Sequence, residues 1–375
     1  MVSLFLLFAF SCARAGDGGQ AAWPSFRGGP AQTGVARVAL PRELALLWTY
    51  EADDAVESTA AIVGGTAYVG TNGGDLLALD LAGGGRKWTY KAKDSISASP
   101  GVAAGRVFVG DMGGTFHAVD AATGKGLWSF ETDAQIISSA NFADGRVLVG
   151  SYDFSLYCFD AAEGKLLWQF ESDAQVHCSP CVAGADALIA GCDGLLRSID
   201  VAGGKEKGNV TLGANMAASP AFDGGYVYLG TYGGTMMCID PAGGKVVWDI
   251  QPVDGGAPFY GSAAVSGSRA VFAGRDQFVR CVDTGNGSER WRFFTRGEID
   301  SSPVICGGDV FVGSGDGNLY RLGLEDGKEK WRFAAGSPIT ASPAIGEGRL
   351  VIGAGDGAVY CFGVKAAGSA APAGE

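Results

Sequence analysis

The sequence predicts an all-β protein, an eight-bladed β-propeller with four antiparallel strands in each blade. Three observations favour this fold. A short phrase ending in tryptophan recurs about every 40 residues, each interval holds four strand-like segments, and the pattern breaks in complementary ways at its two ends. A fixed period of this size is typical of solenoids, propellers and repeat arrays.

The repeated phrase is Asp, two small residues, Thr or Gly, Gly, Lys or Arg, two further residues and Trp, as in residues 120–128. The Gly supplies the positive φ of a tight hairpin, and the Asp can accept hydrogen bonds from the turn. We expect each Trp to dock one blade on the next, with burial contributing at most about 4–6 kcal/mol. One copy carries Gly208 instead, which predicts a thinner seam. The docking residues are Trp48, Trp88, Trp128, Trp168, Trp248, Trp291 and Trp331.

Each interval between tryptophans contains four short segments rich in β-branched and aromatic residues, separated by glycine-bearing turns. This composition is typical of strands joined by hairpins. No helical period interrupts the pattern between residues 44 and 363. In the interval that follows Trp88, the expected strands are 88–90, 97–102, 106–110 and 116–120.

The two ends of the repeat region decide between a closed ring and an open solenoid. The last unit, residues 331–363, lacks its outermost strand, whereas the first strand, residues 44–51, is an orphan with the tryptophan-strand pattern. Joining the two completes one blade and removes the exposed edges of a linear array. We therefore expect an eight-bladed propeller at residues 44–363.

The segments outside the propeller predict an exported protein. Residues 1–15 read as a signal peptide or, alternatively, as a lipoprotein leader in which Cys12 is lipidated. Residues 16–43 form a linker and an arm whose Trp23 and Phe26 should pack on the propeller, and residues 364–375 form a disordered tail. The expected location is the periplasm or the outer membrane, since no later stretch could span a bilayer.

Charge and cysteine usage exclude several classes of function. The net charge of −12 is spread over turns, which argues against nucleic acid and against a membrane contact other than a lipid anchor. Four cysteines share one repeat position with Ala and Ser, so they indicate a small buried slot rather than a disulfide framework. These are Cys158, Cys238, Cys281 and Cys361.

Cys178 and Cys181 form the only tempting redox motif. Two interpretations remain open: buried core thiols, or a redox or metal role. Residues three apart on a strand face opposite sides, and a redox pair normally uses a helix N-terminus. With only His117 and His177 available as further histidine ligands, we expect no metal site.

A candidate binding mouth lies three residues before the proline slot of each inner strand. Most copies have small or apolar residues there, but Glu57, His177, Tyr260 and Asp300 do not. Because inner strands begin near this point, these side chains should surround the mouth of the central channel and bind a ligand or peptide. A solvated polar rim is the alternative interpretation.

The repeated phrase, the Ser-Pro before the inner strands and the turn at residues 315–320 resemble the repeats of pyrroloquinoline quinone (PQQ)-type eight-bladed propellers. The resemblance points to two branches. One is the quinoprotein dehydrogenases, which use a vicinal Cys pair, a calcium ion held by Glu, Asn and Asp, and an Asp base. The other resembles the propeller lipoprotein of the outer-membrane β-barrel assembly machinery and related exported bacterial proteins.

The chain has no adjacent Cys pair, so the resemblance favours the second branch. It implies a monomeric, non-enzymatic binding or scaffold protein of the cell envelope, without a cofactor. The expected partner is another envelope protein or an extended peptide, contacted through the rim, the inner-strand edges or the mouth. The alternatives are a PQQ-dependent oxidoreductase using PQQ and calcium, and an extracytoplasmic sensor or ligand-binding domain.

Overall fold

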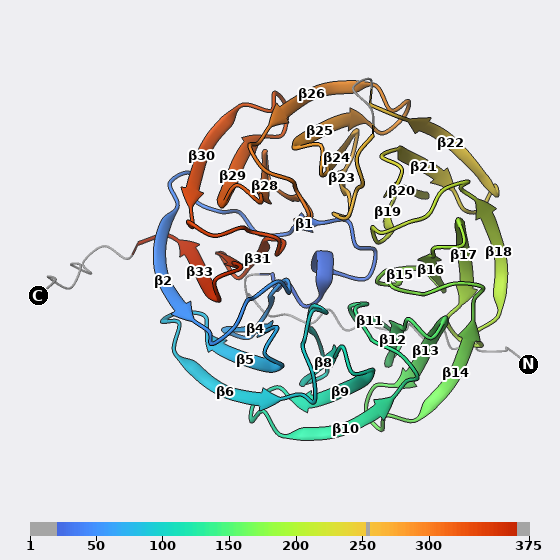
Figure 1. Cartoon of the computed structure of the whole chain (residues 1–375), viewed down its shortest axis with the longest axis horizontal. Helices are drawn as coiled ribbons and strands as arrows, with labels where there is room; N and C mark the ends of the chain where they lie inside the picture. The colour runs from blue at the N-terminus through green and yellow to red at the C-terminus, as the bar shows by residue number, and fades with distance from the viewer. Residues whose placement is uncertain (1–20, 253–255, 366–375) are drawn as a thin grey trace, which may run out of the picture.

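The computed structural model describes residues 21–252 and 256–365, and these form a closed ring of eight blades, each with four antiparallel strands (Figure 1). The predicted fold and blade number are confirmed. The signal-peptide or lipoprotein leader at residues 1–15, with Cys12, lies outside the described residues, as do residues 366–375 of the predicted tail. Among the described residues, no helix is long and apolar enough to cross a membrane.

The first four blades follow one another along the chain. Blade 1 comprises β3 (Ala61–Val63), β4 (Thr66–Gly70), β5 (Asp75–Asp80) and β6 (Arg86–Lys91). Blade 2 comprises β7 (Gly101–Ala103), β8 (Arg106–Gly110), β9 (Thr115–Asp120) and β10 (Gly126–Glu131). Blade 3 comprises β11 (Asn141–Ala143), β12 (Arg146–Gly150), β13 (Ser155–Asp160) and β14 (Leu166–Glu171). Blade 4 comprises β15 (Cys181–Ala183), β16 (Asp186–Ala190), β17 (Leu195–Asp200) and β18 (Glu206–Thr211).

The remaining blades complete the ring. Blade 5 comprises β19 (Ala221–Asp223), β20 (Tyr226–Gly230), β21 (Met236–Asp240) and β22 (Lys245–Ile250). Blade 6 comprises β23 (Ala264–Ser266), β24 (Arg269–Ala273), β25 (Phe278–Asp283) and β26 (Glu289–Phe294). Blade 7 comprises β27 (Val304–Cys306), β28 (Asp309–Gly313), β29 (Asn318–Gly323) and β30 (Glu329–Ala334). Blade 8 comprises β31 (Ala344–Gly346), β32 (Arg349–Gly353), β33 (Ala358–Gly363) and β2 (Ala45–Glu51).

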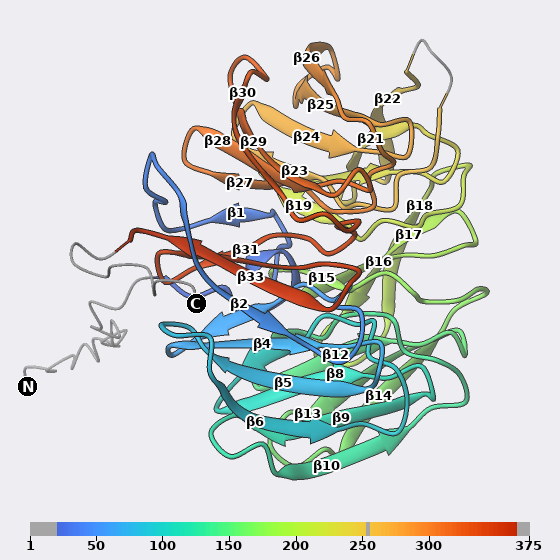
Figure 2. The same ribbon diagram turned by 60° about the vertical axis from the view of Figure 1, so that its left-hand side comes forward.

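Blade 8 joins the two ends of the repeat region, as the sequence predicts. Strand β2 pairs antiparallel with β33, and Trp48 lies opposite Cys361 in the register. Figure 2 shows β2 and β33 side by side. Because this blade combines the beginning and the end of the propeller, it closes the ring by backbone hydrogen bonds and leaves no unpaired end blade.

The position of a strand in its blade explains its burial. The two middle strands are buried along most of their length, as in β8 and β9, because neighbouring blades cover both of their faces. The outer strand β10 instead alternates between exposed and half-buried residues. The core therefore lies between blades, and blade–blade contacts supply much of the buried apolar area.

The arm enters the centre of the ring, where the short helical turn η1 (Phe26–Gly28) and β1 (Val35–Ala36) are seen in Figure 1. Strand β1 pairs parallel with β27 of blade 7. Trp23 is buried and exchanges backbone hydrogen bonds of 2.8 and 2.9 Å with Ile62, whereas Phe26 is only half-buried.

Backbone groups of the arm reach the inner strands of every blade. Carbonyls of residues 21–34 accept hydrogen bonds from backbone N–H groups of blades 1, 2, 4, 5, 6, 7 and 8, and Pro30 accepts one from the Asn141 amide of blade 3. The edge of each inner strand carries backbone N–H groups that have no partner within the blade. The arm accepts hydrogen bonds from these N–H groups, which the central channel would otherwise leave unpaired. The expectation that these edges contact a partner is therefore wrong where the arm occupies them.

Candidate functional site

Two kinds of backbone segment form the face of the ring on which the predicted mouth residues lie. One is the link that leads into each inner strand, and the other is the turn between the second and third strands of the blade. They are joined by backbone hydrogen bonds, such as Tyr232 N to Asn215 O at 2.9 Å and Arg275 N to Pro258 O at 3.1 Å. We call this surface the mouth face. Its loops present side chains from a rigid frame.

Tyr260 and Asp300 come together on the mouth face through a residue that the sequence analysis missed. Arg275 donates two hydrogen bonds of 2.8 Å to the Asp300 carboxylate, and its guanidinium lies 4.1 Å from the centre of the Tyr260 ring. The hydrogen bonds to Asp300 raise the pKa of Arg275, despite its partial burial, so the guanidinium stays charged. The Tyr232 ring packs edge-on against Tyr260 at 5.9 Å.

We define the rim cluster as Tyr232, Tyr260, Arg275 and Asp300. Its members come from the second-to-third-strand turns of blades 5 and 6 and from the links into blades 6 and 7. Tyr232 is 53 % exposed, so the cluster presents an aromatic surface to solvent beside a charged pair. The side-chain hydrogen bond with Tyr232, followed by burial, raises the pKa of Tyr260, so its hydroxyl stays neutral.

The other two predicted mouth residues stand apart from the rim cluster. The half-buried His177, on the link into blade 4, has its ring 5.9 Å from that of Tyr152 and its Nδ1 3.7 Å from Cys192 Sγ. Burial lowers the pKa of His177, which favours the neutral imidazole. Glu57 is exposed on the link into blade 1, and its side chain makes no hydrogen bond or ion pair within the described ranges.

Tyr232 and Arg275 occupy one repeat position, which could have revealed them from the sequence. The same turn position holds Asn72, Met112 and Tyr152 in earlier blades. A side chain there contacts the link that leads into the following blade, as Tyr152 contacts His177 and Arg275 contacts Asp300. An alignment of the repeats that includes both the turn position and the link position would have placed Arg275 beside Asp300.

The structure places Cys178 and Cys181 in the core as free thiols. Cys178 accepts a hydrogen bond from the backbone N–H of Ala190 at 3.2 Å, and Cys181 donates one to the Ala31 carbonyl at 3.3 Å. Burial raises the pKa of Cys178 to about 12 and raises that of Cys181 as well. Both thiols are therefore protonated at neutral pH, and in that form they are poor nucleophiles.

A buried polar chain joins blades 1 and 2. His117 Nε2 lies 2.9 Å from Asp111 Oδ2, and the Tyr90 hydroxyl lies 3.1 Å from His117 Nδ1. Both His117 and Asp111 are shielded from solvent. Burial by itself raises the pKa of Asp111, but hydrogen bonds from His117 and from the Thr115 backbone N–H lower it overall. The group links β6 of blade 1 to β9 of blade 2 and holds the Asp111 turn in place.

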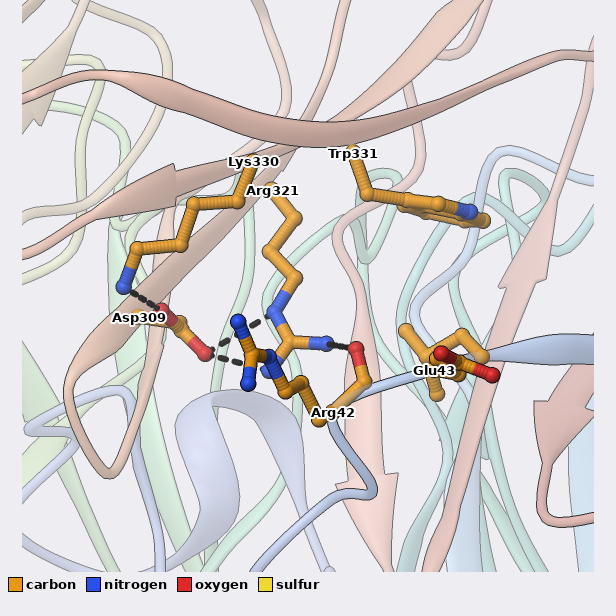
Figure 3. Close-up of a pocket in the computed structure, with 7 residues that line it drawn as sticks. Arg42, Glu43, Asp309, Arg321, Lys330 and Trp331 are labelled. Carbon is orange, nitrogen blue, oxygen red and sulfur yellow. Dashed lines mark hydrogen bonds and ion pairs between the residues drawn. The ribbon is translucent and has the colours of Figure 1, made fainter.

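The seam between blades 7 and 8 contains a cavity of about 820 Å³ (Figure 3). Asp309 bonds Arg321 and Lys330, each at 2.5 Å, and Arg321 also donates to the carbonyl of Arg42 at 2.8 Å. The segment that leads into β2 lies here because the spliced blade 8 has no hairpin at this corner. The lining residues are Arg42, Glu43, Leu44, Asp309, Arg321, Lys330 and Trp331.

No group of three or more His, Cys, Asp or Glu side chains that could hold a metal ion occurs in the described part of the chain. The polar groupings on the mouth face and between blades 1 and 2 are ion pairs and hydrogen-bonded chains, which suit recognition and folding.

Comparison with protein families gives one model, described as outer membrane protein assembly factor BamB, which matches residues 82–216, 192–298 and 275–368. Comparison with curated proteins gives no match. Among solved structures, BamB from Moraxella catarrhalis is 20% identical with a TM-score of 0.74, covering 88% of this chain and 100% of its own.

Two other solved structures show how widely the fold is shared. The computationally designed Ika8 protein is 18% identical with a TM-score of 0.75, covering 84% of this chain and 98% of its own. Quinohemoprotein alcohol dehydrogenase from Comamonas testosteroni is 16% identical with a TM-score of 0.78, covering 93% of this chain and 82% of its own. At these identities the structural matches bear on the fold alone.

Proposed function

The chain belongs to the family described as outer membrane protein assembly factor BamB, and from that membership we propose that it is a non-enzymatic binding protein of the cell envelope. Its role would be to hold another envelope protein or an extended peptide during assembly of the outer membrane. The proposed location is the periplasm or the periplasmic side of the outer membrane, reached through a leader at residues 1–15. In this proposal the protein acts as a monomer and without a cofactor.

The observation that carries this proposal is the rim cluster. Tyr and Arg are enriched among the residues that dominate protein–protein binding, because both offer a large flat surface with a polar end. Here two tyrosines and one arginine lie together across blades 5 to 7. Since Asp300 and the backbone bonds already hold Arg275 in place, little side-chain entropy would be lost when a partner binds.

Extended peptides can also add to an exposed strand edge. The arm occupies the inner edges, so an added strand would pair with an outer strand such as β10, whose residues alternate between exposed and half-buried. This geometry suits a partner rich in β-structure. It also predicts that main-chain pairing occurs at the circumference of the ring, while side-chain recognition occurs at the mouth face.

The PQQ-dependent dehydrogenase is the competing proposal, and we favour the binding role over it. The cysteines of the local motif are buried, separate thiols, and the described chain offers no cluster of metal-binding side chains. We therefore derive no catalytic step through PQQ or calcium. Mixing the purified protein with PQQ and Ca²⁺ should give neither a bound quinone spectrum nor dye reduction.

Affinity purification from envelope membranes after chemical crosslinking tests the binding role. A Tyr232→Ala/Arg275→Ala variant should lose the crosslinked partner. The matched control is Asn72→Ala/Met112→Ala, at the same turn position in blades 1 and 2. Equal capture by both variants would remove the rim cluster from the binding surface, and quinone-dependent dye reduction would favour the enzyme instead.

A further inference from the structure

The blade seams contain a repeated receptor for an indole ring. In five seams the Trp Nε1 donates to the carbonyl of the residue after the Asp position in the next blade, at 2.8–3.0 Å. The ring lies on the Gly of that blade's hairpin: a Cβ added to Gly124 would come within 2.6 Å of the Trp88 ring. The donors are Trp48, Trp88, Trp168, Trp248 and Trp291.

The strand beside each of these rings has a small residue opposite the Trp, which makes room for it. Ala78 lies opposite Trp88, and Cys158 lies opposite Trp168. The small slot recognised in the sequence is therefore one wall of the receptor. Its other parts are the hairpin Gly and the backbone carbonyl of the next blade.

The seam between blades 4 and 5 has the receptor but lacks the ring. Gly208 stands at the Trp position opposite Ser198, which is small like its counterparts. The hairpin Gly of the next blade is Gly244, and a Cβ added there would meet nothing within 4 Å. The Pro241 carbonyl occupies the acceptor position, and no hydrogen bond to it is found within the described ranges.

A cavity of about 410 Å³ opens at this seam. Leu188 and Phe222 provide apolar walls from the two blades, and an Asp186–Lys207 ion pair of 2.7 Å stands at its edge. Strand β18 is exposed at five of its six residues, so the cavity is reached from the circumference of the ring. Its lining residues are Ala183, Asp186, Leu188, Ser198, Lys207, Gly208, Phe222, Gly225, Pro241 and Ala242.

We propose that this indole slot binds a tryptophan side chain supplied by a partner polypeptide. The slot is continuous with the blade 4–blade 5 interface, and the same chain fills the equivalent receptors of other seams with its own indoles. A cavity of this size with apolar walls and a small number of polar groups is typical of a ligand site. The free Pro241 carbonyl selects an aromatic ring that carries an N–H donor. This site goes beyond the mouth face, because it lies on other blades and uses other residues.

Titration of the full chain with 5-fluoroindole and with 5-fluoro-N-acetyltryptophanamide, followed by ¹⁹F NMR, tests the proposal. The ¹⁹F signals of both probes should broaden on binding, and the fraction of bound probe should saturate as the concentration of protein is raised. Gly208→Trp, which fills the slot from its own strand, should abolish the effect, and Ser198→Phe fills it from the opposite strand should the first variant not fold. Gly208→Ala leaves most of the slot open and serves as the matched control. Binding of 1-methyl-5-fluoroindole should be about two- to twelve-fold weaker, because it cannot donate to Pro241.

Each further outcome decides for or against the slot. Broadening that persists in both filled variants would place the probes elsewhere and overturn the proposal. Binding of fluoroindole without binding of the tryptophanamide would overturn the peptide-borne occupant. An Arg275→Ala variant should bind both probes normally, so failure of the mouth face and failure of the indole slot can be told apart.

Discussion

Replacing a seam tryptophan tests whether indole docking holds the ring together. Trp291 is 8 % exposed, and its Nε1 lies 2.8 Å from the Leu324 carbonyl. Its ring covers Gly327, where an added Cβ would lie 2.5 Å from it. Burying roughly 200 Å² of ring at about 25 cal/mol per Å² stabilises the seam by about 5 kcal/mol as an upper bound. Trp→Ala substitutions in cores cost about 3–5 kcal/mol, which is what we expect for Trp291→Ala.

Trp128 provides a control that separates packing from hydrogen bonding. Its ring packs among Phe108, Phe116 and Phe159, but its buried Nε1 has no partner within the described residues. Trp→Phe at position 128 should therefore lose only part of the ring contact. The same change at position 291 should also leave the Leu324 carbonyl without its hydrogen-bond donor, which lowers the free energy of unfolding by about 1 kcal/mol more.

Urea denaturation followed by far-UV circular dichroism measures both free energies of unfolding. A cost below about 1 kcal/mol for Trp291→Ala, or a larger destabilisation by Trp128→Phe than by Trp291→Phe, would contradict the role of indole docking in holding the ring together. Unchanged m-values in the variants would show that the compactness of the unfolded state has not shifted.

Three further predictions concern other parts of the ring. Gly208→Trp should raise the free energy of unfolding by about 0.5–2 kcal/mol through filling the open seam, and no change in urea midpoint would contradict this. Because the pKa of Asp111 is lowered in the fold, its stabilising effect is present above its unfolded pKa and is lost as the pH falls through the folded value. Asp111→Asn should therefore flatten the decline of the urea midpoint below about pH 4. Iodoacetamide should alkylate the half-exposed Cys192 of the native protein before Cys178 and Cys181, as peptide mass mapping can check.

The repeat made the architecture predictable because its signals are local. A hairpin Gly and an Asp that bonds the turn lie within nine residues of the Trp that follows, as in Asp120 and Trp128. The spliced blade was also predictable, since the orphan strand at residues 44–51 and the incomplete last unit are each visible alone. The seam at Gly208 could be anticipated in the same way, from one missing Trp in a regular series.

Part of the candidate site could not be read from this pattern. One repeat position holds Glu57, His177, Tyr260 and Asp300. This shared position distributes the four side chains around the ring and does not say which of them are in contact. Only Tyr260 and Asp300 come together, through Arg275. Arg275 belongs to a different repeat position, in the turn between the second and third strands of its blade, so the link position by itself does not reveal the ion pair.

The sequence by itself determined the number of blades, the strands of each blade and the join in blade 8, because periodic side chains and turn glycines act over a few residues. Tertiary structure alone decided where the arm lies. Its contacts run through backbone carbonyls, such as that of Gly34 bonded to the Ile305 N–H at 2.8 Å, and backbone groups are the same whatever the side chain. Tertiary structure also decided that the open seam offers a free carbonyl and a cavity, since its walls come from two blades that meet only in the folded ring.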